Sequence, residues 1–320
     1  MPFSPLRTRP TDRLAALAAL AAGLLTFAGC ESIHGTSATE TTAAPRTDVI
    51  PRGAEPYAAA NPAITAAPPG KHATRRGPYV FYHDFELDAA DPLFAELEAL
   101  PDQVYGELSL PPGTGIIQVF LFDTQEHYER YMRSKYRTGI GNLPPRRAYF
   151  IAEPRIGSGP DDLKVYTWMG DHLRTDLRHE LTHALLHSTL KDVPLWLDEG
   201  LAGYFELPPA NDGVNPQHLE HLRRGPFTPD LARLEKLTQV KDMEKPEYRE
   251  AWAWVHLMLR GNPEAKKVLC EYLQALRTNP TPGPLQTRLR EVLTDPELAL
   301  ADHLGKIDMP RSRPRTIVSR

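Results

Sequence analysis

Apolar residues recur at two spacings along this chain, and each spacing predicts a different kind of element. Short runs of alternating or continuous apolar residues predict four strands, at 79–83, 116–122, 148–152 and 163–168. Between the first two, Asp91 followed by Pro92 is typical of a helix start. We therefore expect a helix over 93–108, kinked at Pro101, and another over 124–135. Together these elements predict a small mixed β-sheet packed with helices.

The helical spacing is clearest over residues 171–190. Five apolar residues cluster on one side of this predicted helix: Leu173, Leu177, Leu181, Ala184 and Leu185. On the other side lie His179 and His183, one turn apart. A short turn then leads to a second predicted helix over 196–206, so that the two helices form a hairpin.

Helical patterns separated by proline or glycine continue to the end of the chain. They predict five helices, at 219–224, 231–237, 247–259, 265–276 and 285–293. The overall expectation is an α+β fold in which a small mixed sheet precedes the histidine-bearing helix and a C-terminal helical part follows it.

The histidine-bearing helix also carries candidate chemistry, because it contains the H-E-x-x-H motif His179-Glu180-Leu181-Thr182-His183. Two imidazoles at this spacing can bind one metal ion, and Glu180 points towards its open side. His187 lies about 12 Å along the axis from His179, too far to be a third ligand. A helical hairpin would instead bring Glu199 back to the histidines.

The two segments HELTH and WLDEGLAGYFE resemble the gluzincin zinc metallopeptidases, and among them the bacterial peptidase MA-like domain. The likeness is strong over 172–206 and weaker over about 79–300. It implies a zincin-like fold and peptidase activity. It also implies that His179, His183 and Glu199 bind Zn²⁺ while Glu180 acts as the general base.

The same resemblance implies a protein group that stabilises the oxyanion formed during hydrolysis. Related enzymes use a Tyr or His from the helical part, which makes Tyr248 the candidate and His256 the alternative. Either side chain is also consistent with a hydrogen-bonded position in the core. Asp176 and Asp198 are candidates for orienting a ligand, although Asp176 also suits a helix N-terminus.

The functional hypothesis is a zinc-dependent peptidase that hydrolyses peptide bonds in a peptide or protein substrate. The first alternative is a catalytically silent zinc-binding envelope lipoprotein that captures peptides or partner proteins. A structural lipoprotein without metal and a hydrolase of non-peptide amides also remain open, since zinc chemistry does not fix the acyl group.

The first 30 residues predict export. Three arginines precede an Ala/Leu-rich run over 14–28, which is short for a membrane span. The run ends in Phe27-Ala28-Gly29-Cys30, which resembles the lipobox of bacterial lipoproteins, where the cysteine is acylated. The alternative is an ordinary secretory signal with an incidental cysteine. We expect a chain exported to the bacterial cell envelope and anchored to a membrane through Cys30.

Composition sets the remaining boundaries. Residues 31–77 are rich in Thr, Ala and Pro and predict a disordered tether. The metallopeptidase-like domain is expected over 78–305, followed by a basic tail over 306–320. The 320 residues are 41% hydrophobic with a net charge of −4, which suits one domain with extensions. The chain contains no long basic block, so we expect no nucleic-acid partner.

Overall fold

Five strands form one mixed sheet in the computed structural model, which describes residues 67–88, 90–136, 146–154, 159–190 and 192–309. The strands are β1 (His72–Arg76), β2 (Tyr79–His83), β3 (Ile117–Phe122), β4 (Tyr149–Glu153) and β5 (Asp162–Trp168). Their spatial order is β1-β2-β3-β5-β4. The pairs β2–β3 and β3–β5 are parallel, and both edge strands are antiparallel to their neighbours.

Helices cover both faces of this sheet. Apolar residues of β2, β3 and β5 pack on one face against α1 (Pro92–Glu98), α2 (Leu100–Glu107) and α4 (Leu173–His187). A smaller, aromatic cluster on the other face packs beneath α3 (Gln125–Lys135). The strand pattern produces this division because successive side chains along a strand point to opposite faces.

The helix predicted with a kink at Pro101 is divided into two helices at Ala99, which itself keeps right-handed helical backbone angles. Helix α1 begins at Pro92, where the Asp91 side chain accepts a hydrogen bond from the Leu93 amide, and it ends at Glu98. Helix α2 then starts at Leu100. Proline has no amide hydrogen, so Pro101 is tolerated in the first turn of a new helix but not inside a continuous one.

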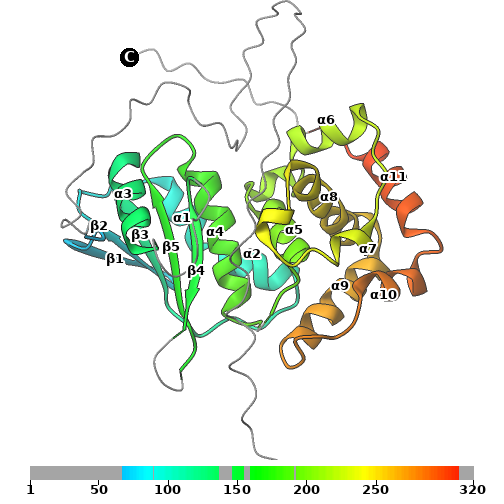
Figure 1. Cartoon of the computed structure of the whole chain (residues 1–320), viewed down its shortest axis with the longest axis horizontal. Helices are drawn as coiled ribbons and strands as arrows, with labels where there is room; N and C mark the ends of the chain where they lie inside the picture. Colours follow the sequence, from blue (N-terminus) through cyan, green and yellow to red (C-terminus); the bar gives the residue numbers. More distant parts are fainter. Residues whose placement is uncertain (1–66, 89, 137–145, 155–158, 191, 310–320) are drawn as a thin grey trace, which may run out of the picture. The chain divides into compact units, whose positions relative to one another are not determined.

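The remaining helices form the C-terminal half of the domain (Figure 1). They are α5 (Leu195–Phe205), α6 (Pro216–Arg224), α7 (Leu231–Leu234), α8 (Lys245–His256), α9 (Pro263–Leu276), α10 (Leu285–Val292) and α11 (Pro296–Lys306). Short 3₁₀ helices occur at Pro209–Asn211 and Val240–Asp242, and a π-helical turn at Leu257–Gly261 continues α8.

The hairpin of α4 and α5 joins the two halves. Helix α4 packs against β5 and β4 on one side and against α5 on the other, and α5 packs closely on α8. Figure 1 shows the green pair α4 and α5 between the sheet and α8. Close approach of α5 to α8 depends on Gly200, because a Cβ there would lie 2.7 Å from the Ala251 carbonyl oxygen.

The expected α+β fold with a small mixed sheet is confirmed, with two corrections. Strand β1 lies within the last residues of the predicted tether, so the folded part begins before residue 78. Its sequence HATRR is polar because β1 is an edge strand with mostly exposed side chains. Helix α11 was also not predicted, although Asp295 and Pro296 start it just as Asp91 and Pro92 start α1.

The predicted targeting segment, with Cys30, lies outside the described residues, as do most of the tether and residues 310–320 of the predicted tail. None of the helices in the described ranges is long and apolar enough to span a membrane.

Candidate metal centre

Helix α4 presents His179 and His183 on the side opposite its packed leucines. Leu177, Leu181 and Leu185 are at most 1% exposed and belong to the main core. The two imidazoles are themselves buried, at 5% and 6% exposure, and their ring centroids lie 4.9 Å apart. The predicted amphipathic arrangement therefore places both histidines in a closed environment, where polar atoms need partners.

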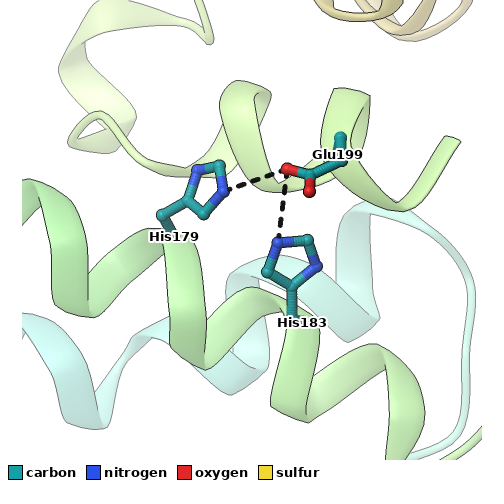
Figure 2. Close-up of side chains that lie close together, drawn as sticks. All are labelled: His179, His183 and Glu199. Carbon is teal, nitrogen blue, oxygen red and sulfur yellow. Dashed lines mark ion pairs between the residues drawn. The ribbon is translucent and has the colours of Figure 1, made fainter. Parts of the chain in front are cut away.

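Helix α5 brings Glu199 to the same point. Its carboxylate is 6% exposed, and its Oε2 atom lies 3.4 Å from Nε2 of His179 and 3.6 Å from Nε2 of His183 (Figure 2). Figure 2 shows the carboxylate of α5 facing both rings of α4. The three side chains that the sequence selected as ligands thus converge, each offering one ligand atom.

The separations fit coordination better than direct hydrogen bonding. Hydrogen bonds of this kind are about 2.7–3.2 Å long, which is shorter than either distance. Two ligands at roughly 2.0–2.1 Å from one tetrahedral ion lie about 3.3–3.4 Å apart. In addition, Oε2 of Glu199 is buried and has no hydrogen-bond partner within the described part of the chain. The donor set of two imidazoles and one carboxylate therefore fits a zinc ion.

Two further carboxylates contact the outer nitrogens of the imidazoles. Oε2 of Glu206 is hydrogen-bonded to Nδ1 of His179 at 3.0 Å, and Oε1 of Glu206 accepts a bond from Asn215. Oδ1 of Asp198 lies 3.0 Å from Nδ1 of His183, and Oδ2 lies 3.1 Å from Nε2 of His187. Glu206 thus holds the His179 ring by a hydrogen bond, whereas Asp198 faces Nδ1 of His183 as an ion-pair partner without hydrogen-bond geometry. In both rings Nε2 faces the Glu199 carboxylate.

The sequence suggested Asp176 and Asp198 as orienting residues, and the structure separates them. Asp198 contacts a ligand, whereas the Asp176 carboxylate contacts Arg147 at 3.0 Å and His172 at 3.9 Å. Sequence reasoning did not select Glu206. A signal for it existed, because Glu206 follows Glu199 by seven residues and so lies on the same face of α5 two turns later.

Electrostatics couple these groups tightly. Burial opposes ionisation of Glu199, but the imidazoles of His179 and His183 outweigh it and hold the pKa of the carboxyl well below its ordinary value. Burial likewise opposes the charged form of His183, yet Asp198 and Glu199 raise the pKa of its imidazole well above the usual range. A metal ion must therefore compete with protons for this site.

Two more residues predicted from the sequence, Glu180 and Tyr248, interact electrostatically with each other, and Tyr248 also with Glu199. Glu180 follows His179 on α4 and is half-buried. Tyr248, on α8, is half-buried too and accepts a hydrogen bond from the Arg146 guanidinium at 2.9 Å. Burial and the charge of Glu199 raise the pKa of Tyr248 to about 12, with a smaller contribution from Glu180. The phenol therefore keeps its proton at neutral pH.

His256, the alternative oxyanion donor, has different surroundings. Its Nδ1 atom lies 2.8 Å from Nε2 of His303, and its ring packs against Tyr204 and Trp252. None of these described contacts involves a ligand residue. Eight residues separate His256 from Tyr248, which corresponds to about 12 Å along α8. Of the two candidates, Tyr248 is influenced by the charge of the ligand residue Glu199, whereas the described contacts of His256 are with His303, Tyr204 and Trp252.

Strand β4 borders the site at the edge of the sheet. Its Phe150 ring lies 6.2 Å from the ring of His183 and 5.2 Å from that of His187. Helix α4 packs directly against this strand. One backbone edge of β4 pairs with β5, and among the described strands β4 has no neighbour on its other edge.

Comparisons of the chain with protein-family models and with curated proteins found no match. Among the residues that the structure describes, His179, His183 and Glu199 form the one group of metal-ligating side chains whose ligand atoms all lie within 4.8 Å of one another. The geometry of this group carries the functional argument.

Proposed function

We propose that this chain is a zinc-dependent peptidase of the gluzincin type, with a zincin-like fold. The observation that carries the proposal is the convergence of two Nε2 atoms from α4 and one carboxylate oxygen from α5 at coordination distances. These three residues would hold a zinc ion with fewer protein ligands than the four of structural zinc sites, as in catalytic zinc sites.

Zinc held by His179, His183 and Glu199 would supply acidity, lowering the pKa of a water molecule towards neutrality and polarising an acyl carbonyl. Glu206 and Asp198 orient the two imidazoles so that they present Nε2. All three ligand side chains are buried, and the lower dielectric of a buried site strengthens these electrostatic interactions.

Glu180 serves as the general base in this proposal. It accepts a proton from the attacking water as the new C–O bond forms, and it then delivers that proton to the leaving amine as the C–N bond breaks. Its place in the motif, directly after His179, puts it beside the metal position. Its charge acts on both Tyr248 and Arg146, which supports an orientation towards the same space.

Tyr248 serves as the oxyanion donor. Its phenol keeps its proton at neutral pH and belongs to the same electrostatic cluster as Glu180 and Glu199. A donor of this kind stabilises negative charge that develops on the carbonyl oxygen in the transition state. Together with the carboxylate base, it completes the set of roles that amide hydrolysis requires.

The proposed substrate is a peptide or protein in extended conformation. Strand β4 offers an edge beside α4, so an extended peptide could pair with it and pass the metal position. Phe150, a residue of β4, packs against the rings of His183 and His187 and would contact a side chain of a substrate bound along this strand. The predicted targeting segment ending in Cys30 is consistent with a proposed site of action in the bacterial cell envelope, from a lipid anchor.

Replacement of Glu180 by Gln tests this function. The full chain should still bind one zinc ion per molecule, while hydrolysis of a peptide library should fall by about 10²- to 10⁴-fold, because only the base is removed. The control is Glu220→Gln, which changes an exposed carboxylate paired with Arg224 and should alter neither property. A wild-type chain that binds zinc but cleaves no peptide would favour a silent peptide-binding protein instead.

A further inference from the structure

One contact bridges the two halves of the domain beside the metal position. Arg146 lies just before β4 in the sheet half, and Tyr248 lies on α8 in the helical half. Although 102 residues separate them, an Nη2 atom of Arg146 lies 2.9 Å from the Tyr248 hydroxyl oxygen. The backbone of Arg146 is also held, since its carbonyl oxygen accepts a bond from the Tyr128 hydroxyl at 2.9 Å.

The direction of this hydrogen bond is fixed by chemistry. A guanidinium group carries only donors, so the phenol oxygen of Tyr248 must be the acceptor. A hydroxyl group has a single proton, and that proton must point away from Arg146. The contact therefore leaves the Tyr248 O–H free to donate to another acceptor and excludes orientations in which it points at the guanidinium.

The charges of Glu199 and Glu180 act on both Arg146 and Tyr248. Burial opposes the Arg146 charge, but Tyr248, Glu199 and Glu180 outweigh burial and raise the pKa of the guanidinium. In the described part of the chain, no carboxylate comes within ion-pair distance of Arg146, and the Tyr248 hydroxyl is its one side-chain partner. The half-buried guanidinium is therefore held by the Tyr248 hydroxyl and not by a direct counter-ion.

The neighbouring arginine is used differently. The guanidinium of Arg147 contacts the buried carboxylate of Asp176 at 3.0 Å, which is an ordinary ion pair between the segment before β4 and α4. The two consecutive arginines thus contact different groups, Arg147 a carboxylate and Arg146 a phenol.

We propose that Arg146 is a positioning residue that orients the Tyr248 hydroxyl as a hydrogen-bond donor towards the carbonyl oxygen of the substrate. This inference rests on the proposed peptidase function and adds to it the residue that sets the direction of the oxyanion donor. Arg146 acts through Tyr248 and does not itself contact the reacting atoms. Because the contact joins the segment just before β4 to α8, it also links the proposed substrate-binding edge to the proposed oxyanion donor.

A double-mutant cycle on the full, zinc-loaded chain tests the proposal. Tyr248→Phe should lower kcat by about 10²- to 10³-fold, as loss of an oxyanion donor does. Arg146→Met should lower kcat about 10- to 100-fold with little change in KM, and Arg146→Lys should restore part of the loss. In the Tyr248→Phe background, Arg146→Met should have no further effect. Additive losses, or a rise in KM alone, would overturn the proposal in favour of direct substrate contact.

A second readout does not depend on activity. In metal-free chain labelled with ¹³C at Cζ of tyrosine, the Tyr248 resonance should shift on Arg146→Met, and it should begin to titrate at higher pH because a nearby positive charge is gone. Arg146→Lys should give an intermediate spectrum. Arg130→Met, which removes an exposed arginine paired with Glu126, is the control and should leave the resonance unchanged.

The two readouts separate the possible failures. If the Tyr248 resonance is the same in wild type and Arg146→Met, the positioning role is overturned, whatever reaction the chain catalyses. Absence of any turnover in the wild-type chain contradicts the proposed function, on which the positioning role in catalysis depends, so that result overturns both.

Discussion

At the scale of single residues, the candidate metal centre contains two imidazoles whose two ring nitrogens face different carboxylates. Each Nε2 faces the Glu199 carboxylate, and each Nδ1 faces another carboxylate, Glu206 for His179 and Asp198 for His183. Such outer partners fix the tautomer of a ligand and increase its basicity. The arrangement separates the residues that would bind a metal ion from the residues that contact those ligands from outside.

Replacement of Glu206 by Gln should therefore weaken zinc binding without abolishing it. The expected loss of affinity is about 10- to 100-fold, because the amide can still hydrogen-bond to His179 but no longer carries charge. Competition with a chromophoric chelator measures the dissociation constant. Glu220→Gln is again the control, as its carboxylate lies on the exposed face of α6. Equal affinity in wild type and Glu206→Gln would show that Glu206 has only a structural role.

The sequence pattern predicts the three candidate ligands, but it predicts only some of the residues that surround them. The i, i+4 spacing places His179 and His183 on one face of a helix, and a hairpin returns Glu199 to them. Arg146 gave no such signal, because it precedes a strand and its contact with Tyr248 spans 102 residues. Long-range contacts of this kind depend on tertiary packing and not on a local pattern.

At the scale of elements, the position of Glu199 depends on how closely α5 packs on α8. Gly200, the next residue, faces the backbone of Ala251, whereas a Cβ at Gly203 would meet the Trp252 Cβ atom at an ordinary van der Waals distance of 3.9 Å. One glycine is therefore required by packing and the other is not. The sequence alone presents both as similar small residues within one helix.

Gly200→Ala and Gly203→Ala form a matched pair. The added methyl at 200 would lie 2.7 Å from a backbone oxygen, so we expect a net loss of about 1–2 kcal/mol in the free energy of unfolding, together with weaker zinc binding as α5 shifts. At 203 the helix propensity of Ala should stabilise the protein by up to about 1 kcal/mol. Urea denaturation measures both. Equal effects of the two substitutions would contradict the proposed close packing.

Element boundaries followed from the sequence where local chemistry was strong. Periodicity located α4 and α5 to within two or three residues at each end, and the strands β2, β3 and β5 were equally plain. Strand β1 could not be recognised because its side chains face solvent and carry no apolar alternation. Helix α11, by contrast, has a clear start signal in the sequence, because Asp295 and Pro296 are typical of an N-cap followed by the first helical residue.

At the scale of the whole molecule, the C-terminal helix α11 is tied to α8 through a pair of histidines. His256 is 2% exposed, and its Nδ1 lies 2.8 Å from Nε2 of His303. One ring must donate and the other accept, so this bond needs a neutral acceptor nitrogen. Burial, with the charge of His303, lowers the pKa of His256 to about 4, and burial lowers the pKa of His303.

Acid should therefore weaken the fold through His256. Between about pH 6.5 and pH 4 the unfolded chain binds a proton that the folded chain excludes, so stability falls as the pH falls through this window. The loss amounts to roughly 3 kcal/mol at most, since each pKa unit is worth 1.36 kcal/mol. The free energy of unfolding at pH 7 and pH 4.5 should differ less in His256→Gln than in wild type. The exposed-site variant His221→Gln should match wild type, and a wild-type pH dependence in His256→Gln would refute this explanation.

The central claim is that two imidazoles and one carboxylate bind a single zinc ion, and zinc bound per chain after equilibrium dialysis tests it most directly. Wild type and His221→Ala, which removes an exposed histidine, should each bind one equivalent. Glu199→Ala should lose at least about 100-fold in affinity, because a ligand and its negative charge are removed. A wild-type chain that binds no zinc, or a Glu199→Ala chain that binds it equally well, would contradict the account.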